Sequence, residues 1–135
     1  MLSAGMIELT NDTSIAEIAP DLDVPITPSL IIKFLDRSQV RIESGPVLVL
    51  DSAGREIGRY TADKGLSGDW KGLIGADVKK IQATEDGRLI VECSDFSITA
   101  HPDPDYEAWT YVRESREMVV ALPGGGIAVW GYPEE

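Results

Sequence analysis

Beyond its first 29 residues, the chain alternates short apolar runs with polar ones. Residues 40–43 read Val-Arg-Ile-Glu, a period of two that is typical of a half-buried strand. Residues 88–93 follow the same rule and place Leu89, Val91 and Cys93 on one face. Residues 47–50 are apolar throughout, which favours a strand buried on both faces. The pattern predicts strands at residues 30–35, 40–43, 47–50, 56–60, 78–83, 88–93, 95–100, 108–112, 117–122 and 127–130.

Turn residues separate these strands at short intervals. The segments 51–54 (Asp-Ser-Ala-Gly) and 84–87 (Thr-Glu-Asp-Gly) predict hairpin turns, with Gly87 suited to the left-handed position. Segments 113–116 and 123–126 connect the last strands. Many short strands at this spacing predict a mainly β fold (β-rich α+β). We expect an antiparallel meander that forms a curved sheet, a sandwich or a small barrel, with one or two short helical turns.

Residues 63–75 are less regular because they contain four glycines. We expect Trp70, Leu73 and Ile74 to anchor a helical turn against the core. The glycines do not form a phosphate loop, since no Gly-Lys-Ser/Thr follows and the Gly-x-Gly-x-x-Gly pattern is absent.

The first 29 residues form an acidic arm, which we expect to pack on or extend from a single β-rich domain of residues 30–135. Ser14 and Glu17 fit a capping box, and a helical turn over residues 15–19 would end at Pro20. The arm is either loosely packed or engages a basic partner. Residues 1–28 contain no Lys or Arg, and their acidic residues are Glu8, Asp12, Glu17, Asp21 and Asp23.

The charge of the chain limits its possible partners. The 135 residues carry a formal net charge of −11, which disfavours nucleic acids and acidic membrane surfaces because both would be repelled. A basic protein would be attracted, although the charge can also serve solubility alone. There is no apolar run long enough for a signal peptide or a membrane span, so we expect a cytoplasmic protein.

The sequence offers no catalytic set, and we expect neither an enzyme nor a cofactor. Cys93, the single cysteine, is expected to be a small buried hydrophobic residue, and the single histidine, His101, is eight positions away. There is no Gly-x-Ser-x-Gly elbow, and one histidine leaves little for a catalytic triad.

Three carboxylates alternate in residues 102–109, Pro-Asp-Pro-Asp-Tyr-Glu-Ala-Trp. In an extended chain Asp103, Asp105 and Glu107 would share one side and could bind a hard cation such as calcium. The spacing lacks the glycine and the terminal glutamate of a calcium loop, so we expect no metal site. The alternative is a proline-shaped crossing between strands, in which Asp side chains accept hydrogen bonds from nearby backbone N–H groups.

Most of the aromatic residues lie in the last third of the chain. We expect Trp109 and Trp130 to be core anchors, because each can bury a large apolar area. Tyr106 is the best candidate for a contact residue, since Tyr and Trp dominate binding hot spots.

Residues 73–78, 86–89, 102–109 and 122–130 resemble a family of small bacterial proteins of unknown function that are frequent in actinomycetes. The shared pattern is Pro-Asp-Pro-x-Tyr-Glu-Ala-Trp followed by Pro-Gly-Gly-x-x-Ala-Val-Trp. The resemblance implies a compact β-rich domain and no assigned activity or catalytic residues. Small acidic proteins of this type also resemble immunity proteins, which neutralise a cognate toxin.

Our leading hypothesis is a non-enzymatic protein-binding module, an immunity-type inhibitor of a basic toxin domain that acts by charge complementarity. The alternatives are a ligand- or metal-binding protein or enzyme that uses the Asp103–Glu107 carboxylates, and a homo-oligomeric structural protein; the oligomeric state is left open. The expected partner-binding residues are Asp12, Glu17, Asp21, Asp23, Asp103, Asp105, Tyr106 and Glu107.

Overall fold

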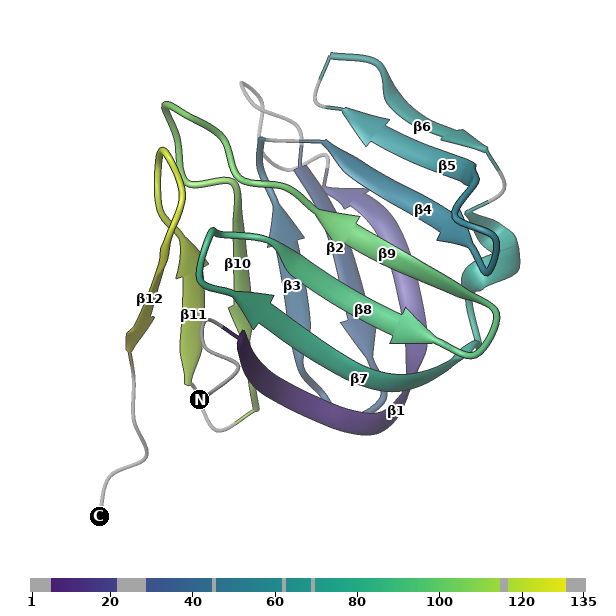
Figure 1. Cartoon of the computed structure of the whole chain (residues 1–135). Helices are drawn as coiled ribbons and strands as arrows, with labels where there is room; N and C mark the ends of the chain where they lie inside the picture. Colours follow the sequence, from purple (N-terminus) through teal and green to yellow (C-terminus); the bar gives the residue numbers. More distant parts are fainter. Residues whose placement is uncertain are drawn as a thin grey trace.

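The computed structural model describes residues 6–21, 29–44, 46–61, 63–68, 70–114 and 117–130. These residues form one open, curved antiparallel sheet, in the strand order β12-β11-β10-β3-β2-β1-β7-β8-β9-β4-β5-β6 (Figure 1). The prediction of a mainly β, antiparallel fold is confirmed. The strands are β1 (Met6–Asp21), β2 (Ser29–Phe34), β3 (Gln39–Ile42), β4 (Val47–Asp51), β5 (Glu56–Thr61), β6 (Gly65–Gly68), β7 (Asp77–Thr84), β8 (Leu89–Cys93), β9 (Phe96–Ala100), β10 (Trp109–Val112), β11 (Met118–Ala121) and β12 (Ile127–Trp130).

The long strand β1 joins the two halves of the sheet. Its first part pairs with β7, from Met6 opposite Thr84 to Ser14 opposite Asp77, and its second part pairs with β2. Each of these ladders contains a register shift. Asp12, which lies between the two shifts, has a positive φ of 56°. Such irregularities bend a strand. The sheet therefore folds over, so that β2, β3 and β10 lie behind β7, β8 and β9 (Figure 1).

The prediction of a helical turn over residues 15–19 is wrong. The hydroxyl of Ser14 donates to Asp77 Oδ1 (3.5 Å), and the Glu17 carboxylate lies 3.9 Å from Lys33 Nζ, so the two residues do not cap a helix. A capping box stabilises only one turn, and a short isolated helix is marginal in water. In the strand, by contrast, the backbone from Ile15 onward pairs with β2 and the side chain of Ile15 is buried.

The core fills the space between the two halves of the sheet. Leu89, Val91 and Cys93 of β8 all point into it, as predicted. The prediction that residues 47–50 are buried on both faces is wrong, because Leu48 and Leu50 are only half-buried. The largest fully buried side chains come from both halves: Trp109, Tyr111, Ile15, Leu30, Ile32, Ile42, Ile81, Leu89, Ile98, Val40, Val47 and Val49.

Residues 63–75 contain more order than their glycines indicated. They form the edge strand β6 and a 3-10 helix, Lys71–Leu73, with Trp70 and Leu73 buried as predicted and Ile74 exposed. Gly68 has a φ of 93°, and a Cβ there would lie 2.4 Å from the carbonyl oxygen of Ile57. Only glycine therefore allows β6 to approach β5 so closely.

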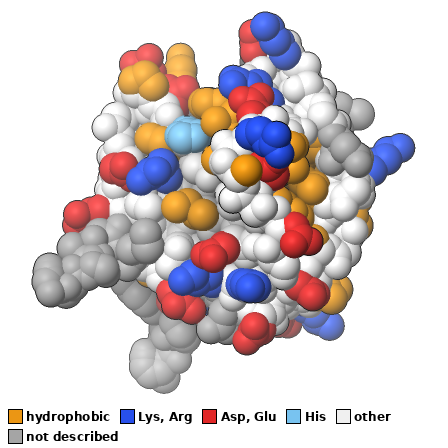
Figure 2. Space-filling model, turned by 45° about the vertical axis from the view of Figure 1, so that its right-hand side comes forward, with side chains coloured by type: hydrophobic (Ala, Val, Ile, Leu, Met, Phe, Trp, Pro, Cys, Tyr) orange, Lys and Arg blue, Asp and Glu red, His pale blue; other side chains and the backbone are white. Residues whose placement is uncertain are grey.

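Helical structure is minimal in the described part of the chain, and no helix there is long or apolar enough to cross a bilayer. On the face seen in Figure 2, acidic and basic side chains are interspersed, with hydrophobic side chains between them.

Candidate contact surface at the loop cluster

Three connections meet at one end of the sheet: the β7–β8 turn (residues 84–88), the β9–β10 connection (101–108) and the β11–β12 turn (122–126). We call them the loop cluster. The indole N–H of the fully buried Trp109 donates to the carbonyl of Gly87 (2.9 Å), and the N–H of Gly124 donates to the carbonyl of Asp103 (2.8 Å). Hydrogen bonds of this kind hold loops in one arrangement. The two motifs of the sequence resemblance, residues 102–109 and 123–130, are thus joined in space.

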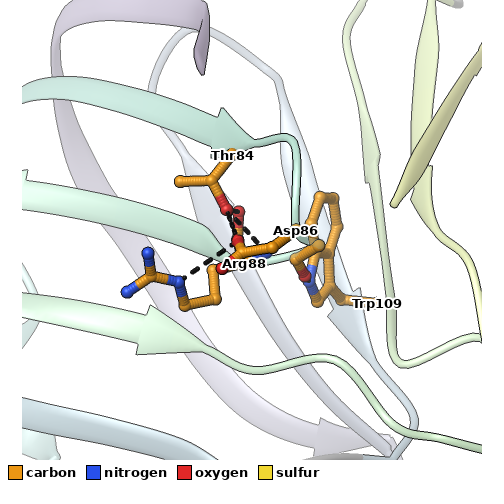
Figure 3. Close-up of polar contacts among 5 residues, drawn as sticks. Thr84, Asp86, Arg88 and Trp109 are labelled. Atoms are coloured by element: carbon orange, nitrogen blue, oxygen red, sulfur yellow. Dashed lines mark hydrogen bonds and ion pairs between the residues drawn. The ribbon is translucent and has the colours of Figure 1, made fainter. Parts of the chain in front are cut away.

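The β7–β8 turn is held by a small polar network (Figure 3). The Thr84 hydroxyl donates to the Asp86 carboxylate and accepts the backbone N–H of Arg88 (3.0 Å). The guanidinium Nε of Arg88 donates to Asp86 Oδ1 (3.3 Å). The Thr84 hydrogen bond lowers the pKa of Asp86 most; desolvation, the second-largest effect, opposes it, and Arg88 lowers the pKa further.

Gly87 lies where the three connections are closest. Its φ is 96°, and a Cβ there would lie 3.1 Å from Pro102 Cβ and 3.3 Å from the backbone nitrogen of Gly126. Glycine is needed here both for the backbone conformation and for the packing. The prediction of a left-handed glycine at this turn is confirmed.

The β9–β10 connection presents an exposed tyrosine. Asp103 Oδ1 accepts the backbone N–H groups of Asp105 (2.8 Å) and Tyr106 (3.2 Å), which confirms the backbone-capping interpretation for this residue. The side chain of Tyr106 is 66% exposed, and those of Asp105 and Glu107 on either side are exposed too. The chain bends at residues 104–106, so the alternation argument for three carboxylates on one side of a strand does not hold.

Metal-binding chemistry finds no support in the described ranges: no group of three or more His, Cys, Asp or Glu side chains there could hold a metal ion. One oxygen of Asp103 is already used by two backbone N–H groups.

The acidic candidates of the N-terminal segment lie elsewhere. Asp12 lines a shallow hollow of about 480 Å³ at the bend of β1, together with Leu35, Asp36 and Asp77. Thr13, its neighbour, pairs with Val78, so the hollow and the β7–β8 turn lie at opposite ends of β7, about 20 Å apart. Glu17 faces Lys33, as described above. The side chain of Asp21 and all of Asp23 lie outside the described residues.

Cys93 and His101 do not form a catalytic pair. Leu89 is opposite Ala100 in the β8–β9 ladder, so Cys93 and His101 lie at opposite ends of it, about 17 Å apart. Burial, with smaller effects of Glu92 and Asp77, raises the pKa of the Cys93 thiol to about 12. The pKa of His101 is lowered by burial and by Arg88.

The aromatic residues divide differently from the prediction. Trp109 is a core residue as expected. Trp130 is 47% exposed on the edge strand β12, so the prediction that it is a core anchor is wrong. A strand at the sheet edge has a neighbouring strand on one side only, so its side chains are less covered. Sequence reasoning also missed Thr84 and Asp86, although the Thr-x-Asp-Gly turn that it identified contains both residues.

Comparison with known protein families matches residues 22–131 to the one described as Family of unknown function (DUF6188). Neither a curated protein nor a solved structure matches the chain. The matched region includes the whole loop cluster and begins after β1.

Proposed function

The chain belongs to the Family of unknown function (DUF6188), and we propose that it is a non-enzymatic protein-binding module, an immunity-type protein that binds and inhibits a basic toxin domain. The observation that carries this proposal is the exposed Tyr106, held on an anchored loop between two exposed carboxylates.

The anchoring of the loop favours binding by Tyr106. Asp103 holds the backbone N–H of Tyr106, and the carbonyl of Asp103 is in turn held by Gly124. A tyrosine ring has few rotatable bonds, so its immobilisation on binding costs little conformational entropy. Rigid aromatic residues at the centre of a contact commonly dominate its binding energy.

The charge around Tyr106 selects the partner. The side chains of Asp105 and Glu107 make no ion pair with any residue that the structure describes. Both carboxylates are therefore available to Lys or Arg side chains of another protein, with which they form charge-assisted hydrogen bonds. The net charge of −11 steers a basic domain toward this surface. In the proposed mechanism, Tyr106 enters a basic active-site cleft and the carboxylates neutralise the residues that would otherwise bind substrate.

The test is co-expression with the product of each neighbouring gene. One of these products is expected to arrest growth alone, to be neutralised by this protein, and to bind it in calorimetry. Tyr106→Ala is expected to weaken binding by about 30-fold, the size of a hot-spot loss of about 2 kcal/mol. Asp105→Lys is expected to weaken it as well, by placing like charges opposite one another.

Matched controls are available at the other end of the molecule. Asp95, in the β8–β9 turn, and Ile74 are both exposed, so Asp95→Lys and Ile74→Ala change the same properties away from the loop cluster. Both should leave binding unchanged. The proposal is wrong if no neighbouring product binds, or if Tyr106→Ala binds as tightly as Ile74→Ala.

A further inference from the structure

The outer face of the strands β7, β8, β9, β4 and β5, turned away from the core, presents two rows of side chains. The pairing registers define both rows, because residues directly opposite one another in a ladder share a face. The first row is Gln82, Ile90, Thr99, Leu48 and Arg59, and the second is Lys80, Glu92, Ser97, Leu50 and Glu56.

The centre of this outer face is apolar. Leu48, Leu50 and Ile90 point outward and are only half-buried, while the residues between them along the strands, such as Val49 and Val91, are buried in the core. Ser97 and Thr99 separate them with small side chains. Water therefore contacts an apolar stripe that a partner surface could cover.

The charges at the two ends of the stripe cancel. Lys80 Nζ lies 4.0 Å from Glu92 Oε1, and Arg59 donates two hydrogen bonds to Glu56 at 2.8 and 3.0 Å. The two rows thus carry no net charge, although the chain carries −11. Figure 2 shows acidic and basic side chains close together around hydrophobic ones on the face that it presents. A second copy, repelled by most of the molecule, can approach this face without that penalty.

We propose that this outer face is the interface of a homodimer, in which a two-fold axis runs along β9. Around that axis, β4 of each subunit lies opposite β8 of the other, and β5 lies opposite β7. Each row of side chains faces the same row of the partner subunit. Leu48 then contacts Ile90 of the partner subunit, and Glu56 contacts Lys80 of the partner subunit. Both contacts occur twice, since the interface is isologous. Glu56 and Lys80 at the ends are therefore complementary, Leu48 and Ile90 form an apolar contact, and Leu50 lies opposite Glu92 of the partner subunit.

The first test measures mass by sedimentation velocity of the full chain from micromolar to millimolar concentration. Wild type is expected to shift from monomer to dimer. Leu48→Asp is expected to remain monomeric, because it places two unpaired carboxylates in the apolar centre. Leu35→Asp is the matched control: Leu35 is 68% exposed in the β2–β3 turn, so this variant should dimerise like wild type. Circular dichroism confirms that both variants are folded.

The second test is a charge exchange that depends on the orientation of the partners. Glu56→Lys and Lys80→Glu, each alone, bring like charges together across the interface and should weaken dimerisation by tenfold or more. The double variant restores opposite charges and should recover most of the loss. Each single change also removes an exposed ion pair within one chain, which contributes little to folding.

A wild-type protein that stays monomeric throughout the concentration range overturns the proposal. A dimer that persists in Leu48→Asp overturns it too, because another surface must then form the contact. Failure of the charge exchange to recover dimerisation excludes the proposed axis. None of these outcomes depends on Tyr106 or on the binding of another protein.

Discussion

Replacement of Trp109 by phenylalanine removes the indole N–H that joins the loop cluster to the core. Trp109 is fully buried, and its N–H donates to the Gly87 carbonyl at 2.9 Å. A buried carbonyl left without its partner costs about 1–3 kcal/mol. The smaller ring also leaves unfilled volume. A Trp→Ala change, which removes the whole ring, costs roughly 3–5 kcal/mol. The total loss of stability in Trp109→Phe must stay below the sum of that value and the cost of the lost hydrogen bond. We therefore expect a loss of about 2–4 kcal/mol in the free energy of unfolding.

The assay is urea unfolding followed by far-ultraviolet circular dichroism, with the midpoint and the slope fitted separately. A lower midpoint at an unchanged slope reports a true loss of stability. The melting temperature should fall by on the order of 10 °C for a domain of this size. Trp130→Phe is the control, since Trp130 is 47% exposed, and its effect should stay within about 0.5 kcal/mol.

Two results would refute this reasoning. Equal effects of Trp109→Phe and Trp130→Phe would mean that the hydrogen bond to Gly87 does not hold the loop cluster. A loss below about 1 kcal/mol in Trp109→Phe would mean that water or another donor replaces the indole N–H.

Three further predictions concern single residues. Gly87→Ala is expected to destabilise the protein by more than Gly54→Ala, because both have positive φ but only Gly87 also has close neighbours; chemical denaturation of both variants checks this. Asp86 has a lowered pKa in the folded state, so its stabilising effect is present above the unfolded-state pKa of 3.8 and is lost as pH falls through the folded-state pKa. Asp86→Asn should therefore flatten the acid limb of a plot of unfolding free energy against pH. An unchanged acid limb contradicts this prediction. The Cys93 thiol, with its pKa raised to about 12, should react with iodoacetamide at pH 8 only after urea is added; rapid labelling of the folded protein would show that it is accessible.

The strands were predictable because their side chains alternate in a way that depends only on local geometry. Leu89, Val91 and Cys93 lie on one face in any extended conformation, whatever the strand pairs with. The same logic failed at residues 15–19, where a local helix signal competes with pairing to β2. That partner lies outside the segment, and a local pattern contains no information about it.

The loop cluster was only partly predictable for the same reason. The sequence identified Asp103, Asp105, Tyr106 and Glu107 by composition, and the structure places them on one connection. It did not indicate that Gly87 would pack against that connection, because the contact joins three turns that are far apart in sequence. Residue type predicts what a side chain can do, whereas its neighbours depend on the order of the strands.

The two proposed surfaces differ in charge, and this difference separates them experimentally. Tyr106 lies among carboxylates without ion pairs in the described residues, so capture of a basic domain should weaken steeply as salt is added. The outer face has paired charges around an apolar centre, and added salt also screens the repulsion between two chains of −11. Dimerisation should therefore be unchanged or stronger at high salt. If both reactions weaken with salt in parallel, the outer face is not the dimer interface.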